Sequence, residues 1–181
     1  MTDEYAEAFK KEADDPSMQA YLRSLGLDPD YVPPSDDPRR VVVKSLSIVF
    51  KEHGPSAVID FNTDYDGTEK TVIKHKEPLI IKEGTEFKML VEFRVQHQIV
   101  HGFKIHSTVK KMGASIVDET VMLGSYPPSN NFKTVTIQDY QPAPSGTLGR
   151  GEYMSHMKFL DDTKKLYLDI EYKIKISKDW K

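Results

Sequence analysis

The amino-acid sequence predicts an all-β protein, an immunoglobulin-like antiparallel β-sandwich preceded by a flexible, partly helical N-terminal arm. Some eight or nine short strand patterns follow one another after residue 40, turn residues separate them, and no long helical pattern intervenes. The strongest pattern runs through residues 83–111, where apolar and polar side chains alternate in two segments. We interpret these segments as neighbouring strands of one sheet.

A proline-rich linker, residues 31–38, divides the chain into an arm at residues 1–38 and a sandwich domain at residues 39–181. Residues 1–40 carry ten acidic and five basic side chains, a net charge of −5, whereas the remaining residues carry eighteen acidic and twenty basic ones, a net of +2. The acidic arm is therefore either a binding segment for a basic partner or a solvated tail, and its charge fits both.

The arm holds two short helical patterns. Residues 6–13 favour helix, and Asp15 followed by Pro16 is a start signal, because Asp caps free N–H groups and Pro suits the first helical position. The second helix carries Tyr21 on its apolar face and is expected to end at Gly26. Helices this short are marginal in water, so we expect them to fold against the sandwich or against another protein.

The strands of the sandwich are recognised by alternating or continuous apolar residues between turn signals such as Gly54-Pro55. Residues 161–163 are expected to form the turn of a closing hairpin, and residues 139–145 are expected to be irregular. The predicted strands are residues 41–50, 57–61, 71–73, 79–81, two within 83–111, then 115–123, 152–160 and 166–176.

Composition excludes several classes of protein. The chain has no cysteine, which excludes disulfides, thiolate catalysis and zinc fingers. A net charge of −3 and the absence of a basic cluster interleaved with aromatics argue against a nucleic-acid surface. No segment approaches the roughly 18 apolar residues of a membrane span, and the first residues are polar rather than those of a signal peptide. We therefore expect a cytoplasmic protein without stable membrane insertion.

No motif for catalysis, a metal or a cofactor stands out. His97 and His101 would lie about 13 Å apart along an extended strand, too far for one zinc ion. The glycine-rich residues 146–151 lack the spacing, the lysine and the following helix of a phosphate-binding loop. What remains is a surplus of apolar strand residues, which either fill a closed core or line a slot between splayed sheets. Periodicity is compatible with both alternatives.

Five blocks of the sequence carry a resemblance. They are LIIKEGTEFKMLVEFRVQHQIVHGFKI, MLGSYPP, APSGTLGRGEY, KFLDDTKK and IKISKDW. Together they resemble the Rho guanine-nucleotide dissociation inhibitors, and the match runs in order from about Asp15 to Trp180. The resemblance implies a sandwich whose sheets part to accept the prenyl tail of a Rho/Rac-family GTPase, with the arm on the GTPase switch regions.

The resemblance further implies a non-enzymatic inhibitor of GDP release. Such a protein prefers the GDP-bound GTPase, removes it from membranes by holding its geranylgeranyl tail, and acts as a monomer that forms a 1:1 heterodimer. No cofactor or metal is implied.

Individual residues receive roles from the same resemblance. Asp15 and Tyr21 match arm positions that contact the switch regions, with a plain helix cap as the alternative for Asp15. Asp161 and Asp162 match an acidic hairpin that faces the GTPase, with a plain turn as the alternative. The positions that match lipid-binding ones are Leu46, Ile48, Leu79, Phe87, Ile99, Ile170 and Tyr172.

Some residues depart from the family pattern, and other functions remain as alternatives. Ile170 and Tyr172 stand where tryptophans are usual, which leaves the lipid preference open. Gln141-Pro142 replaces an acidic pair that would meet a basic GTPase tail, so the remaining acidic candidates are Asp118, Glu119 and Asp139. A general prenyl or lipid carrier of the phosphodiesterase delta type would use the sandwich alone, and a metal-dependent hydrolase would use the histidines.

Overall fold

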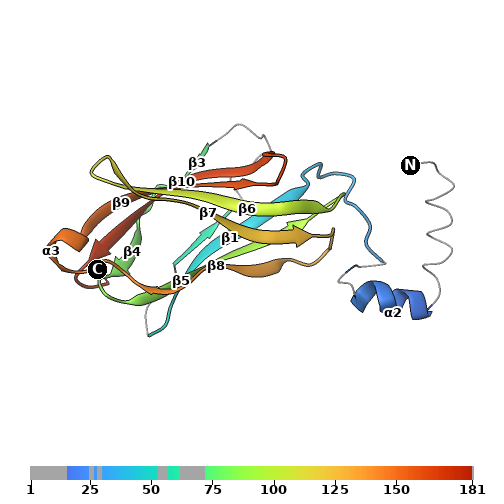
Figure 1. The fold of residues 1–181 in the computed structure, drawn as a ribbon, viewed down its shortest axis with the longest axis horizontal. Helices are drawn as coiled ribbons and strands as arrows, with labels where there is room; N and C mark the ends of the chain where they lie inside the picture. The colour runs from blue at the N-terminus through green and yellow to red at the C-terminus, as the bar shows by residue number, and fades with distance from the viewer. Residues whose placement is uncertain (1–15, 25–26, 28–29, 53–56, 62–71, 181) are drawn as a thin grey trace.

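Two β-sheets packed face to face form the body of the protein (Figure 1). The computed structural model describes residues 16–24, 27, 30–52, 57–61 and 72–180. The four-stranded sheet has the order β2 (Ala57–Asp60), β1 (Val41–Phe50), β5 (Glu86–Val95), β8 (Lys133–Pro142). The larger sheet has the order β3 (Val72–Lys74), β10 (Leu166–Ser177), β9 (Gly151–Leu160), β6 (Val100–Lys111), β7 (Ala114–Tyr126), and β4 (Leu79–Lys82) also pairs with β10.

Antiparallel pairing dominates both sheets, which confirms the predicted all-β, immunoglobulin-like sandwich. Within the described part of the chain, β3 and β4 alone run parallel to their neighbour, and both pair with β10. The predicted closing hairpin is also confirmed, because β9 and β10 pair antiparallel along almost their whole length.

The core lies between the sheets and consists of the inward-facing residues of each strand. Along β5, half-buried and buried residues alternate at every position, as the two-residue period of a strand requires. Phe93 of β5 packs against Phe103 of β6 with ring centroids 4.8 Å apart, and Phe103 lies 6.1 Å from Phe159 of β9. All three rings are completely buried, so this aromatic cluster joins the two sheets.

The two strands within residues 83–111 do not pair with each other, and the sequence interpretation is wrong on this point. β5 pairs with β1 and β8 in the smaller sheet, whereas β6 pairs with β7 and β9 in the larger one. Residues 96–99 therefore cross from one sheet to the other. Alternation indicates only that each strand has one buried face, and a facing sheet buries that face as well as an adjacent strand does.

β8 is a strand that the sequence interpretation misses, and it includes residues 139–142, which we expect to be irregular. Its register against β5 shifts twice, between Phe87 and Met89 and between Met89 and Leu90. Each shift interrupts the alternation of inward and outward side chains, so the two-residue signal is lost. A single helical turn, α3 (Gly146–Gly149), then leads into β9.

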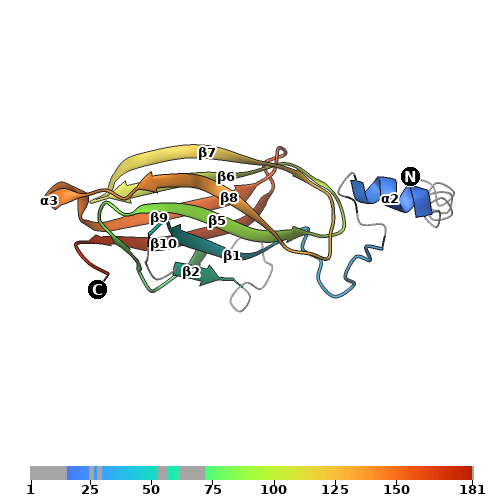
Figure 2. The same ribbon diagram turned by 90° about the horizontal axis from the view of Figure 1, so that it is seen from below.

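The second arm helix is α2, Pro16–Ser24, and it begins at the predicted proline. Both views place α2 beyond the end of the sandwich at which β1 begins (Figures 1 and 2). No helix among the described residues is long and apolar enough to cross a membrane. The predicted helix at residues 6–13, Asp15 and the predicted helix stop at Gly26 lie outside the described residues.

Candidate functional site

An apolar cavity of about 220 Å³ lies between the two sheets. Its walls come from β5 and β8 on one side and from β4, β6, β7, β9 and β10 on the other. It reaches the surface between β7 and β8, which are the edge strands of opposite sheets. There Ile116 of β7 contributes to the lining although its side chain is 53% exposed.

Small side chains among large apolar ones leave the space open. Ser107 of β6 and Ser155 of β9 line the cavity and are both buried. The Ser155 hydroxyl has no hydrogen bond of normal geometry and interacts only weakly with the Tyr172 hydroxyl, so the main effect of a serine at this position is the room that it leaves. A larger apolar side chain at either serine would occupy the cavity.

Tyr172 supplies an uncharged aromatic wall. Its ring is buried and its hydroxyl lies 3.7 Å from the sulfur of Met157, another lining residue. Burial raises the pKa of Tyr172 to about 12, and the neighbouring Ser155 hydroxyl opposes this rise. The phenol therefore stays neutral at physiological pH, which suits an apolar ligand.

The predicted lipid-binding residues separate into three groups. Phe87 and Tyr172 line the cavity. Ile99 is not in the lining of this cavity, and it is 41% exposed on the connection between β5 and β6, so its predicted role in lipid binding stays a prediction. The others are buried in the core outside the described lining: Leu46, Ile48, Leu79 and Ile170.

Much of the lining comes from residues that sequence reasoning does not single out as lipid-binding. Val117 and Val121 of β7 and Ile137 of β8 are among them. The alternation within residues 115–123 was the available signal for β7, whereas β8 goes unrecognised because of its two register shifts. Glu119 also belongs to the lining, which places a carboxylate beside the apolar opening.

The cavity is smaller than a long lipid requires. Pockets for small-molecule ligands measure roughly 300–1,000 Å³, whereas this cavity measures about 220 Å³. A long hydrocarbon chain therefore enters only if the sheets separate further at the open edge. β7 is suited to move, because most of its residues are exposed and it pairs with β6 alone among the described strands.

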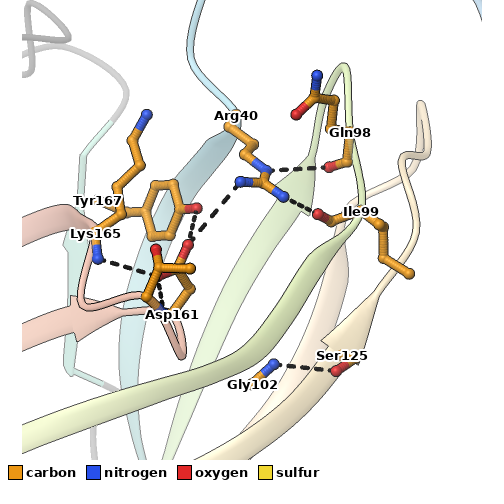
Figure 3. A network of polar contacts seen from close by, with 9 residues as sticks. Arg40, Gln98, Ile99, Gly102, Ser125, Asp161, Lys165 and Tyr167 are labelled. Carbon is orange, nitrogen blue, oxygen red and sulfur yellow. Dashed lines mark hydrogen bonds and ion pairs between the residues drawn. The ribbon is translucent and has the colours of Figure 1, made fainter. Parts of the chain in front are cut away.

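A polar network surrounds Arg40 at the end of the sandwich from which the arm leaves (Figure 3). Arg40 donates hydrogen bonds to the carbonyl oxygens of Gln98, at 3.5 Å, and of Ile99. Its guanidinium also lies 4.0 Å from the carboxylate of Asp161. Arg40 immediately precedes β1, so these contacts join the linker, the β5–β6 connection and the β9–β10 hairpin.

Asp161 organises the β9–β10 hairpin from inside. Its carboxylate accepts hydrogen bonds from the Thr163 N–H and hydroxyl at 2.9 and 2.6 Å, from the Lys165 N–H at 3.0 Å and from the Tyr167 hydroxyl at 2.7 Å (Figure 3). Burial on its own raises the pKa of Asp161, but these hydrogen bonds together hold it below the usual value. The side chain is only 2% exposed, so of the predicted acidic pair Asp162 alone offers an accessible carboxylate.

Two predicted partner contacts are exposed at this end. Tyr21 is 58% exposed on α2, and Asp162 is exposed at the hairpin turn. The Asp162 N–H donates to the His101 carbonyl at 3.1 Å, which holds the turn against β6. Gly102 permits this approach, because it has a φ of +57° and a Cβ there would lie 3.0 Å from the Cβ of Asp162.

The linker is anchored to the sandwich through His97. The His97 N–H donates to the Tyr31 hydroxyl at 3.0 Å, and its Nε2 lies 2.7 Å from the Asp37 carbonyl oxygen. Arg39 bonds both carboxylate oxygens of Asp37, at 2.7 and 2.6 Å, and thereby lowers the pKa of Asp37 to about 2. His97 has a φ of +64°, which is uncommon for a residue other than glycine. This left-handed backbone conformation directs the N–H of His97 toward the linker.

We expect Tyr31→Phe to loosen the linker without unfolding the sandwich. It removes one hydrogen bond, so the free energy of unfolding falls by about 1 kcal/mol, while limited proteolysis cuts residues 31–38 faster. Tyr140→Phe, a change at an exposed tyrosine of β8, is the matched control. Equal cleavage rates for the two variants would contradict the anchoring role of the Tyr31 hydroxyl.

Comparison with known proteins identifies the family. A family model described as RHO protein GDP dissociation inhibitor matches residues 2–179. The chain belongs to this family. It is 34% identical to the Rho GDP-dissociation inhibitor of Schizosaccharomyces pombe, over 97% of this chain and 82% of the relative. It is also 34% identical to putative rho GDP-dissociation inhibitor 1 of Dictyostelium discoideum, over 95% and 85%, and 32% identical to human Rho GDP-dissociation inhibitor 1, over 93% and 78%.

Membership of the Rho GDP-dissociation inhibitor family confirms the resemblance that the five sequence blocks carry. The family is described by a regulatory binding activity rather than by catalysis. Within the described ranges, no three His, Asp or Glu side chains gather as a metal site would require. His97, which raised the metal alternative, contacts the linker instead.

Proposed function

We propose that the chain binds prenylated Rho-family GTPases in their GDP-bound state, slows the release of GDP and keeps the prenyl tail out of the membrane. The observation that carries the proposal is the apolar cavity with an open edge between β7 and β8, in a chain of the Rho GDP-dissociation inhibitor family. The tail is geranylgeranyl, the complex is a 1:1 heterodimer, and the exchange takes place at the cytoplasmic face of membranes.

The energetics favour a division of labour between the cavity and the arm. Each buried methylene contributes about 0.8 kcal/mol, so a twenty-carbon tail carries on the order of 10 kcal/mol or more. The bilayer offers the tail a similar free energy, which leaves the transfer near balance. Contacts between the GTPase and the end of the sandwich from which the arm leaves then decide whether the tail moves from the bilayer to the cavity. They can do so because lipid binding and protein binding occur in one complex.

Membrane extraction is the direct test. Incubation with membranes that carry a geranylgeranylated Rho-family GTPase is expected to move the GTPase into the supernatant after centrifugation, more completely with GDP than with a GTP analogue. Failure with every prenylated Rho-family GTPase tested would overturn the proposal.

Removing the start of the arm separates an inhibitor from a general lipid carrier. Deletion of residues 1–24 removes α2 and Tyr21 but keeps the linker anchors Tyr31 and Asp37. We expect the truncated protein to bind a prenylated peptide almost unchanged while it no longer slows GDP release, measured with a fluorescent nucleotide. Full inhibition of GDP release by the truncated protein would contradict the role of the arm.

A further inference from the structure

Figure 1 shows α3 at the end of the sandwich opposite α2. Two large apolar side chains, one on α3 and one in the neighbouring turn between β6 and β7, are exposed there. Met112, in the turn between β6 and β7, is 98% exposed, and Leu148 of α3 is 92% exposed. Neither side chain contributes to the core. We call this end the distal end and define it by Met112, Leu148, Lys110, Arg150 and Lys173.

Met112 occupies a backbone position that suits another residue better. Met112 and Gly113 have φ values of +49° and +83° and form the two-residue turn between β6 and β7. Such turns favour Asn-Gly, because Asn tolerates a positive φ far better than a long apolar residue does. Neither the turn nor the core therefore favours methionine here. A residue that departs from a local rule without a structural gain points to function.

Leu148 is held outward by a rigid frame. Lys111, the residue before the turn, donates from Nζ to the Leu148 carbonyl, to the Arg150 carbonyl at 2.9 Å and to the Tyr153 hydroxyl at 3.1 Å. The Tyr153 hydroxyl in turn donates to the Gly149 carbonyl at 2.5 Å. These hydrogen bonds join α3 to the end of β6, so the backbone segments that carry Leu148 and Met112 are held together. We call these two exposed side chains the apolar tips.

Basic side chains surround the tips. A surface hollow of about 500 Å³ lies at the distal end. Lys110 and Lys173 flank Met154 in register across β6, β9 and β10, and Met154 is itself 39% exposed. Arg150 pairs with Glu83 at 3.2 Å. The charged residues that line the hollow are Lys110, Lys111, Arg150, Glu152 and Lys173.

We propose that the distal end docks on the surface of an anionic lipid bilayer. Apolar tips enter the boundary between headgroups and acyl chains, while lysines around them meet anionic headgroups. A bilayer accepts separate tips with cations between them, whereas a protein partner needs a matching contour. The acidic arm, whose first 40 residues carry a net charge of −5, is repelled by the same surface, so the molecule docks with the arm directed away.

Docking at this end places the apolar cavity near the lipid. Tyr153 lines both the cavity and the basic hollow, so the two lie next to each other at this residue. The contact needs no GTPase, and its test is therefore independent of membrane extraction.

Vesicle sedimentation tests the proposal with the full chain. The protein is expected to sediment with vesicles of equimolar phosphatidylcholine and phosphatidylserine at low salt, and far less with phosphatidylcholine alone or at high salt. Lys110→Gln and Lys173→Gln are each expected to lower the partition about fivefold, from about 1 kcal/mol for each basic residue near an anionic surface. Leu148→Ser is expected to lower it as well.

Met112→Asn separates docking from folding. This variant keeps or raises the unfolding temperature, because Asn-Gly suits the turn, yet it is expected to lower vesicle binding. Met122→Ser and Lys104→Gln are matched controls, since Met122 is 61% exposed and pairs with Lys104 nearer the other end of the same two strands. Wild-type protein that fails to bind the anionic vesicles, or Met112→Asn and Lys110→Gln proteins that bind like the wild type, would overturn the proposal.

Discussion

Ser155→Leu is expected to weaken capture of a prenyl group strongly while the protein remains folded. The new side chain occupies part of the cavity, which measures about 220 Å³, in place of roughly three methylene-sized groups of the ligand. At about 0.8 kcal/mol each, the loss is about 2 kcal/mol, or roughly fiftyfold in affinity. The free energy of unfolding is expected to stay equal or rise, because a buried hydroxyl without a normal hydrogen bond is replaced by apolar atoms.

Ser155→Ala is the matched control for this prediction, because it removes the same hydroxyl and leaves the cavity open. It is expected to keep prenyl affinity. Titration of a fluorescent geranylgeranylated peptide measures binding, and urea unfolding measures stability. Equal affinities for the Leu and Ala variants would mean that the lipid binds elsewhere, and a Leu variant that unfolds would call for the same comparison with Ser107→Val, at a second buried serine of the cavity.

Local signals in the sequence were sufficient for most strands. β5 alternates at every position, and its apolar residues, Phe87 and Phe93 among them, are the buried ones. The β9–β10 hairpin follows from apolar strands on either side of an Asp-rich turn. These elements are predictable because the signal and its cause lie within one or two neighbouring strands.

The assignment of strands to sheets was not predictable in the same way. Val95 and Val100 are both buried, so the end of β5 and the start of β6 look alike in the sequence although the connection between them changes sheets. The cavity shares this difficulty, since its volume depends on how far apart two sheets lie. Ser107 and Ser155 read as ordinary strand residues until both sheets are in place. The sequence predicts a surplus of apolar strand residues, but it does not predict on which side of the sandwich the cavity opens.

The contacts at the end of the sandwich from which the arm leaves could not be predicted for a different reason. They involve main-chain groups. Arg40 bonds the carbonyl oxygens of Gln98 and Ile99, and His97 bonds the carbonyl oxygen of Asp37. Every residue has a main-chain carbonyl oxygen, so the residue type does not reveal which of them accepts a hydrogen bond. The sequence of the linker therefore indicates only a proline-rich spacer, although Tyr31 and Asp37, near its two ends, both contact His97 of the β5–β6 connection.

Asp161→Ala is expected to be strongly destabilising. The substitution leaves the N–H groups of Thr163 and Lys165 and the hydroxyl of Tyr167 without their acceptor, and it removes the carboxylate that lies 4.0 Å from Arg40. Buried donors that lose a charged partner cost about 1–3 kcal/mol each, with partial relief where water reaches the turn. We expect a loss of about 3–4 kcal/mol in the free energy of unfolding, measured by urea denaturation at neutral pH.

The pH dependence distinguishes the carboxylate from a simple loss of packing. Because the folded state holds the pKa of Asp161 below its ordinary value, its contribution is complete above about pH 4, the unfolded value, and is lost as the pH falls through the folded pKa. The difference between wild type and Asp161→Ala should therefore shrink in acid. Asp162→Ala, at the exposed neighbour, is expected to stay within about 0.5 kcal/mol of the wild type. If both aspartates prove equally dispensable for folding while GTPase binding is lost, the buried one is a contact residue that rearranges on binding rather than the internal support of the hairpin.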